Sequence, residues 1–198
     1  GSSPSYGSAS SLGSSMSTAA LCDTHCNGQG VMVAEGGLMQ DYGGRSSFQG
    51  EIMTAQSFDS SSVVQQILQG PGANKVLVVD GGGSRQSAIF DSELASLAQR
   101  NGWAGVVING CVRGADSLSR VSIGVKAIGT HPRKGQQMSQ GMNGASLTFG
   151  GVSFTPGCWI YADKDGIIVS DRQLSTGATP SYGTGAIPSY GTGATPSY

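Results

Sequence analysis

The sequence predicts a mixed α/β fold, in which one compact domain is flanked by low-complexity segments. Two observations lead to this prediction. Between residues 50 and 109, apolar strand-like stretches alternate with helix-like stretches, as in α/β domains. From Lys126 onward, short strands are separated by turns rich in glycine. A chain of 198 residues suits a single domain with extensions. We expect the domain to cover residues 21–174, between a Ser/Gly/Ala-rich segment at 1–20 and a repeat tail at 175–198.

Strand and helix are predicted to alternate in the first half of the domain. Residues 50–58 (GEIMTAQSF) have the apolar and β-branched content of a strand. Residues 61–69 (SSVVQQILQ) begin with serine caps and then place apolar side chains on one helical face. Residues 75–80 (KVLVVD) are apolar almost throughout, which predicts a strand covered on both faces.

A capped helix, a buried strand and two hairpins are predicted to follow. The helix DSELASLAQRNG begins at Asp91, a favourable N-cap residue, and ends at Gly102. Residues 104–109 (AGVVIN) form the next buried strand. Further on, SLTFGGVSF predicts a hairpin around Gly150-Gly151, and WIYADKDGIIVS predicts another around Asp165-Gly166.

Composition and charge exclude several classes of function. A net charge of −1 and a pI near 6.1 leave no basic footprint for direct nucleic-acid binding. No apolar run reaches eighteen residues, so we expect no membrane insertion. The two histidines show no Ser/His/Asp pattern.

Cysteine usage points to a reducing compartment. Cys22 and Cys26 have His25 between them, but a second pair of zinc ligands is missing. We therefore expect four reduced thiols in a cytoplasmic protein or in an organelle interior. The protein is not expected to be secreted, because no basic region precedes an apolar one at the N-terminus.

Neither end of the chain can bury enough apolar surface to order itself alone, so we expect both to be disordered in isolation. The C-terminal tail repeats TPSYGTGA and carries Tyr182, Tyr190 and Tyr198. Regularly spaced tyrosines in such a background are typical of a multivalent contact peptide that binds a shared partner. A passive linker or an appended sequence is an equally good interpretation.

Three consecutive glycines, Gly81-Gly82-Gly83, follow a predicted strand. They match neither the dinucleotide-binding pattern G-x-G-x-x-G nor the phosphate-binding pattern that ends in lysine. The next helix begins eight residues later. A nucleotide site is therefore not expected here.

Several motifs together make the chain resemble the RraA family across roughly residues 19–174. The motifs are LCDTHC, YGGRSSFQG, VLVVDGGGS, DSELASLAQRNGWAGVVINGCVR, IGVKAIGTHPRK, TFGGVSF and YADKDGIIVS. The family contains regulators of ribonuclease E and divalent-metal aldolases that cleave 4-hydroxy-4-methyl-2-oxoglutarate and decarboxylate oxaloacetate. The resemblance implies a swivelling β/β/α fold of the phosphohistidine-domain type. It also implies a homotrimeric ring, which some members pair into a dimer of trimers.

In the aldolases, the resemblance implies a substrate site built from three parts. Backbone amides at a helix start, here Asp91-Ser92-Glu93-Leu94, would bind the substrate carboxylate. Arg113 would clamp the same group. The residue after that arginine would hold Mg²⁺ or Mn²⁺, and in this chain it is Gly114.

This chain departs from the aldolase pattern at three positions. Gly114 offers no carboxylate, Asp91 stands where active members tend to have glycine, and Ser84 stands where they often have a further acidic residue. Asp116 is a weak substitute ligand. We therefore expect no cofactor, no confident catalytic residue and a vestigial Arg113. That arginine would be structural, paired with Asp91 or across a trimer interface.

Three hypotheses remain open at this stage. The first is a non-catalytic, RraA-like interaction protein that modulates a ribonuclease, a helicase or another assembly by protein contact. The second is a metal-dependent keto-acid aldolase or decarboxylase, a lyase, with a relocated ligand. The third is a structural hub whose Pro-Ser-Tyr tails bind a larger assembly.

Overall fold

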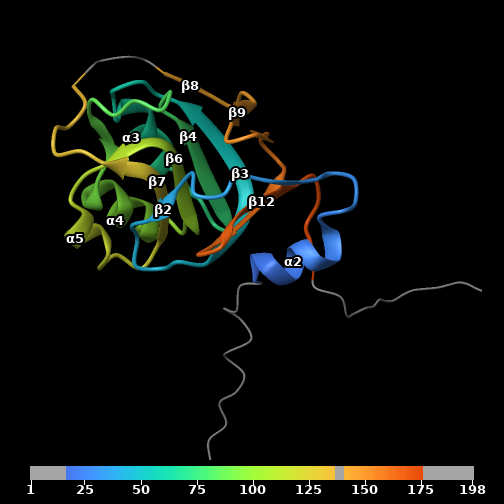
Figure 1. The fold of residues 1–198 in the computed structure, drawn as a ribbon. Helices are drawn as coiled ribbons and strands as arrows, with labels where there is room; N and C mark the ends of the chain where they lie inside the picture. Colours follow the sequence, from blue (N-terminus) through green and yellow to red (C-terminus); the bar gives the residue numbers. More distant parts are fainter. Residues whose placement is uncertain (1–16, 137–140, 176–198) are drawn as a thin grey trace, which may run out of the picture.

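The computed structural model describes residues 17–136 and 141–175, which form one mixed α/β domain (Figure 1). Its helices are α2 (Thr18–His25), α3 (Ser62–Leu68), α4 (Ser92–Arg100) and α5 (Ala115–Leu118). Its strands are β1 (Val31–Val33), β2 (Gln40–Asp41), β3 (Phe48–Gln56), β4 (Lys75–Asp80), β5 (Ala88–Phe90), β6 (Gly105–Val112), β7 (Gly124–Thr130), β8 (Met142–Asn143), β9 (Leu147–Phe149), β10 (Val152–Phe154), β11 (Trp159–Asp163) and β12 (Gly166–Ser170). The α/β class predicted from the sequence is confirmed.

The main sheet has the order β1-β12-β11-β3-β4-β6-β7-β2, with β5 also paired to β6 and β8 to β3. The four central strands β3, β4, β6 and β7 are parallel, whereas β11, β12, β1 and β2 join antiparallel. Strand β4 shows why the centre is apolar. Leu77 and Val79 enter the core on one face, while Val76 and Val78 enter the core on the other.

Helices and hairpins occupy opposite sides of this sheet. Helices α3, α4 and α5 lie together on one side of the sheet (Figure 1), and they contribute buried side chains to the first core. The small β9–β10 sheet packs on the second core, together with β11 and β12. Because both faces are covered, the central strands lack the polar alternation of a half-exposed sheet.

The predicted helices and the first hairpin are confirmed. In α4, the Asp91 carboxylate accepts a hydrogen bond from Leu94 N at 3.0 Å, and Gly102 follows the C-cap in the left-handed region. In the first hairpin, Phe149 pairs with Val152, so Gly150-Gly151 forms a two-residue turn. Both glycines have positive φ, as a type I′ turn requires.

Other predicted boundaries are wrong by a few residues. The second hairpin turns at Lys164-Asp165, because Asp163 pairs with Gly166, one residue before the predicted position. Strand β6 continues to Val112, three residues past its predicted end, since β5 and β7 both pair with its last residues. The sequence reading missed β7 as a full-length parallel strand.

One aromatic ring fixes the packing of two adjacent strands. Gly105 on β6 pairs with Gly124 on β7, and the ring of Phe48 lies directly over both glycines. A Cβ at Gly105 would come within 2.3 Å of that ring, and one at Gly124 within 2.0 Å. Any side chain here would displace Phe48, which is buried in the second core.

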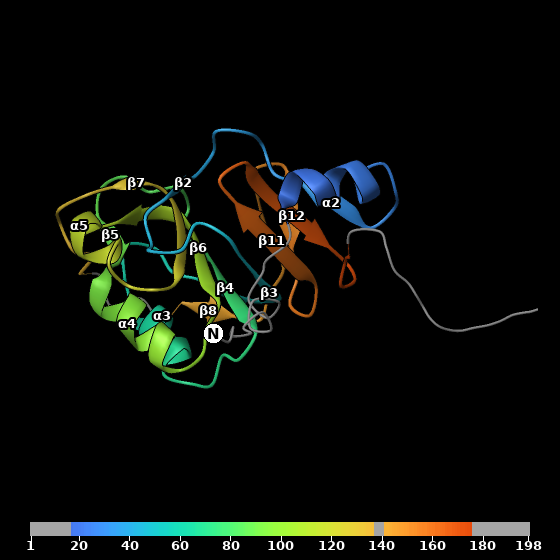
Figure 2. The same ribbon diagram turned by 90° about the horizontal axis from the view of Figure 1, so that it is seen from below.

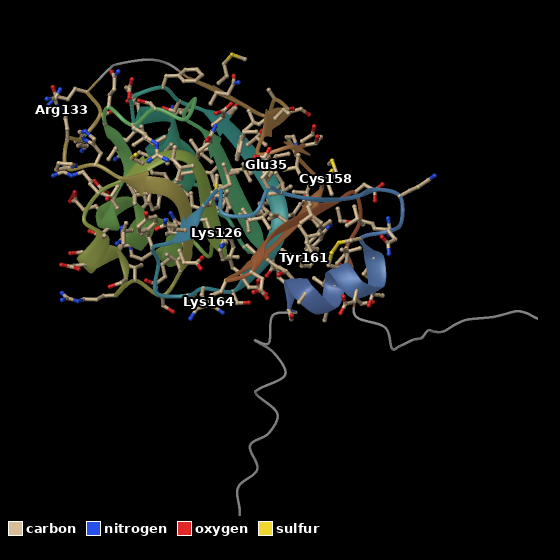
Figure 3. The ribbon with its side chains drawn as sticks, in the orientation of Figure 1. Glu35, Lys126, Arg133, Cys158, Tyr161 and Lys164 are labelled. Carbon is tan, nitrogen blue, oxygen red and sulfur yellow. A yellow bond between two sulfur atoms is a disulfide. The ribbon has the colours of Figure 1, made fainter. Side chains whose placement is uncertain are left out.

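The edge strand β2 is attached through a buried ion pair. Lys126 Nζ on β7 lies 3.0 Å from Asp41 Oδ1 on β2, and the lysine side chain is 3% exposed (Figure 3). The contact lacks good hydrogen-bond geometry, so it is an ion pair alone.

Helix α2 covers the far end of the sheet, over β11 and β12 (Figure 2). It begins at Thr18, inside the segment predicted to be of low complexity, with Ser17 as its N-cap. Thr18 donates to both carboxylate oxygens of Asp163, from its amide at 2.8 Å and from its hydroxyl at 2.6 Å. Leu21 is fully buried against Tyr161 and Ile168.

The prediction of four reduced thiols is wrong for two of them. Cys22 and Cys26 form a disulfide, with their Cα atoms 4.5 Å apart. One helical turn brings the two side chains together, although their spacing does not match that of zinc ligands. Cys111 and Cys158 are free thiols.

No helix in the described part of the chain is long and apolar enough to cross a membrane. The predicted contact residues Tyr182, Tyr190 and Tyr198 lie outside the described residues.

We predict that Gly105→Ala or Gly124→Ala destabilises the fold by about 1–3 kcal/mol, because the added methyl group overpacks the core against Phe48. Gly36→Ala is the matched control, since a Cβ there meets nothing within 4 Å and its free energy should change by less than about 0.5 kcal/mol. Urea unfolding measures both changes. Equal stability of all three variants would contradict this account of the packing.

The second stability prediction concerns acid. Burial raises the pKa of Asp163, but the hydrogen bonds from Thr18, Asp165 and Gly166 outweigh it and hold that pKa below its ordinary value. A lowered folded-state pKa gives stability that is present above about pH 4 and is lost as the pH falls through the folded value. We expect Asp163→Asn to be less stable than wild type near neutral pH, with the difference shrinking toward about pH 3. A pH-independent difference in urea unfolding would refute the assignment.

Candidate functional site

Two strand ends bring the predicted site residues together. Phe90 at the end of β5 pairs with Val112 at the end of β6, and Arg113 N donates to Phe90 O at 3.0 Å. Asp91, which follows β5, and Arg113, which follows β6, are therefore neighbours. Asp91 starts α4 on one side, while Arg113 and Gly114 lead into α5 on the other.

The start of α4 provides the amide cradle expected from the resemblance. Its first free amides belong to Ser92, Glu93 and Leu94, but Asp91 Oδ1 already accepts from Leu94 N. The cap places a carboxylate at the helix start where the resemblance implies that a substrate carboxylate would bind, and it already accepts from the Leu94 amide. A hollow of about 270 Å³ lies beside this helix start. It is lined by Ser61, Gln65, Gln69, Asp91, Glu93, Leu94, Leu97, Arg100 and Lys134.

Arg113 is half-buried and does not line that hollow. Within residues 17–136 and 141–175 it forms no ion pair. The predicted pairing with Asp91 in the same chain is therefore wrong, because the Asp91 carboxylate is turned toward its own helix. A contact across a trimer interface stays a prediction.

Gly114, where the resemblance implies a metal ligand, has a left-handed conformation, with φ 69° and ψ 44°. It precedes α5, and Leu118 N donates to its carbonyl at 2.8 Å. A Cβ at Gly114 would meet nothing within 4 Å, so the space for a side chain exists. Asp116 lies exposed in the single turn of α5, two residues from that position.

These residues do not fit a divalent metal within one chain. Mg²⁺ and Mn²⁺ prefer several oxygen ligands, and Gly114 supplies no side-chain oxygen. No cluster of three or more His, Cys, Asp or Glu side chains suited to a metal occurs in the part of the chain that the structure describes.

The backbone amides of the glycine-rich loop donate hydrogen bonds within the domain. Gly81 N and Gly83 N both donate to Asn109 O at 3.0 Å, and Gly82 N donates to Asp80 Oδ1 at 2.8 Å. All three glycine amides are therefore engaged and unavailable to a phosphate. The absence of a nucleotide site here stays a prediction.

The sequence reading missed a second hollow, of about 300 Å³, lined by Asp59, Gln86, Ser87, Arg133, Lys134 and Gln136. Lys134 lines both hollows, so they adjoin. Asp59 Oδ1 accepts from Ser87 Oγ at 2.6 Å and from Ser84 Oγ at 2.8 Å, and these bonds lower the pKa of Asp59 although burial opposes them. Asp59 also has φ 53°, which is unusual for a non-glycine residue. Nothing in the local sequence around Asp59 signals this contact, which joins residues more than twenty positions apart.

A comparison with known families gives a match over most of the domain. The RraA-like family, described as Aldolase/RraA, matches residues 18–169. The chain belongs to the RraA-like family.

Relatives of this RraA-like chain carry different names. A Hahella chejuensis protein with the provisional name 4-hydroxy-4-methyl-2-oxoglutarate aldolase is 46% identical over 155 residues, which cover 78% of this chain and 93% of that protein. A structure described as the RNA-processing inhibitor RraA from Thermus thermophilis is 33% identical, with a TM-score of 0.76 over 82% of this chain and 96% of its own. A Geobacillus kaustophilus structure described as an S-adenosylmethionine:2-dimethylmenaquinone methyltransferase is 41% identical, with a TM-score of 0.76, and covers 80% of this chain and 97% of its own. The family and its fold are therefore shown, while the relatives' names do not agree on one activity.

We predict that Asp91→Ala destabilises the RraA-like domain by about 1 kcal/mol, because α4 loses the side chain that caps Leu94 N. Asp91→Asn keeps a capping oxygen and should lie close to wild type. The measurement is the free energy of unfolding in urea. An alanine variant as stable as the asparagine variant would mean that the carboxylate serves something other than the cap.

Proposed function

We propose that this chain is a non-catalytic, RraA-like regulatory protein that modulates a partner by protein–protein contact. The observation that carries the proposal is the engagement of the Asp91 carboxylate with Leu94 N, at the place where an aldolase would bind its substrate carboxylate. Gly114 supports the same conclusion, since it offers no ligand where a metal would be needed. Under this proposal, the Asp91 carboxylate occupies the amide that would bind a substrate carboxylate. Gly114 provides no side-chain ligand for the metal ion that would polarise a keto acid.

The partner class follows from the family and from charge. One relative of similar fold is described as an RNA-processing inhibitor. A net charge of −1 gives this chain little attraction for RNA itself. A ribonuclease or an RNA helicase, contacted as a protein, is therefore the proposed target. The active form is proposed to be a homotrimer in which Arg113 contacts a neighbouring subunit. Two such trimers are proposed to pair in the alternative assembly.

An aldolase or decarboxylase is the second candidate, favoured by two observations. Relatives 41–46% identical carry a provisional aldolase name, and Arg113 is retained beside the start of α4. In that case Mg²⁺ or Mn²⁺ would supply Lewis-acid polarisation, and Asp116 would have to stand in as a ligand. A structural hub that uses the repeated tyrosines of the tail is the third candidate.

The deciding assay is pyruvate release from oxaloacetate and from 4-hydroxy-4-methyl-2-oxoglutarate, with Mg²⁺ or Mn²⁺ present. We expect wild type to release no more pyruvate than Arg113→Ala. The double variant Gly114→Asp, Asp91→Gly should release at least about tenfold more, equivalent to 1.4 kcal/mol, because a bound metal contributes several kcal/mol to such reactions. Aspartate tolerates the left-handed conformation at residue 114 better than most residues do, so the variant should fold.

Robust wild-type turnover that a chelator abolishes and Arg113→Ala removes would overturn the proposal in favour of the lyase. A second assay tests the regulatory function. It measures RNA cleavage by a ribonuclease E-type enzyme with and without the full-length chain. We expect slower cleavage with wild type and with Arg113→Ala alike, provided that both remain assembled. Unchanged cleavage together with no turnover would refute the ribonuclease as the target.

A further inference from the structure

Helix α2 holds both ends of the described chain on one surface. Its first residue, Thr18, binds the Asp163 carboxylate on β11. At its other end, His25 Nε2 donates to Ser175 O at 2.6 Å, which makes Nε2 the protonated ring nitrogen. Between them, Leu21 packs with Leu174 against Tyr161 (Figure 3). The segment that leads into the tyrosine repeats is therefore attached at its base to the first helix.

The last turn of α2 is weak on its own sequence. The helix has eight residues, below the length at which isolated helices are stable, and it ends in Asp23-Thr24-His25, which are poor helix formers. Cys26 is its C-cap, and Cys26 N donates to Cys22 O at 2.9 Å. The Cys22–Cys26 disulfide closes this same turn, which contains His25. The covalent bond therefore supports the turn that presents His25 to Ser175.

The disulfide is also placed for exchange. Cys22 and Cys26 are half-buried at the surface, whereas Cys111 is buried. If the protein works in a reducing compartment, such a disulfide is transient and redox-sensing rather than permanent. Thiol–disulfide exchange needs a sulfur that a thiolate can reach, and both cysteines are only partly buried where they pack against the core around Leu21.

We propose that Cys22 and Cys26 form a redox-modification site whose state controls how the C-terminal segment is held on α2. A dithiol reductant, small or carried by an oxidoreductase, attacks one sulfur and forms a mixed disulfide. Its second thiol then resolves that bond. Two electrons and two protons pass to the protein, giving two cysteine thiols, and the reductant leaves as its own disulfide.

Reduction removes the covalent support of the last turn of α2. The turn then frays, and His25 loses its fixed position against Ser175 O. The contact between Leu174 N and Tyr161 Oη, 2.7 Å in the oxidised form, loses support at the same end. The base of the repeat tail is thereby released, while the Thr18–Asp163 contact keeps the start of α2 attached.

The first test counts thiols in the full-length protein, purified without reductant. Alkylation after denaturation should modify two of the four cysteines, Cys111 and Cys158. Incubation of the native protein with dithiothreitol before alkylation should raise this to four. Four modified cysteines at the outset, or a bond that resists dithiothreitol until the fold is unfolded, would overturn the proposal.

The second test measures amide hydrogen exchange in the same full-length protein. We expect exchange at Cys26 and Leu174 to rise about tenfold on reduction, while amides in β4 stay unchanged. Cys22→Ser and Cys26→Ser should show the faster exchange with or without dithiothreitol. Cys158→Ser is the matched control and should respond like wild type. Equal exchange at Leu174 in oxidised, reduced and serine-substituted proteins would sink the proposal, even if the disulfide itself forms.

Discussion

Burial of the central strands on both faces is the constraint on which the rest of the structure depends. Strand β4 sends alternate side chains into two separate cores, so neither face can be left to solvent. Apolar transfer of about 25 cal/mol per Å² then requires a layer on each side. The helices α3, α4 and α5 provide one layer, and the β9–β10 and β11–β12 hairpins provide the other. The position of every loop at the sheet edges follows from this arrangement.

The site is a consequence of that layering. Strand β5 is short, yet its pairing with the end of β6 sets Asp91 beside Arg113, and the helix that must cover the sheet begins there. Helix starts and arginine side chains both favour anions, but Arg113 does not line the hollow beside the start of α4. The Asp91 side chain determines whether the Leu94 amide is free to bind another group. With aspartate at the cap, the fold gains stability, but the amide that would receive a ligand is consumed.

Local features of the sequence predicted local structure well. The cap at Asp91, the glycine turn at 150–151 and the apolar run at 75–80 depend only on neighbouring residues, and the structure has each of them. Contacts that join distant parts of the chain could not be predicted from neighbouring residues alone. The length of β6 depends on β5 and β7, and the position of Asp59 depends on Ser84 and Ser87. Helix α2 was missed because its stability comes from Asp163, far along the chain, and not from its own composition.

Gly114 bears both on the stability of the fold and on the proposed function. A glycine with φ 69° adopts the left-handed conformation without the backbone strain that an aspartate at the same place would carry. Strained backbone persists only where the surrounding structure enforces it. Asp91 and Gly114 each favour the native fold, Asp91 by capping α4 and Gly114 by adopting the left-handed conformation without strain. Under the proposed function, both residues belong to a surface that keeps the family fold and serves recognition by a partner protein.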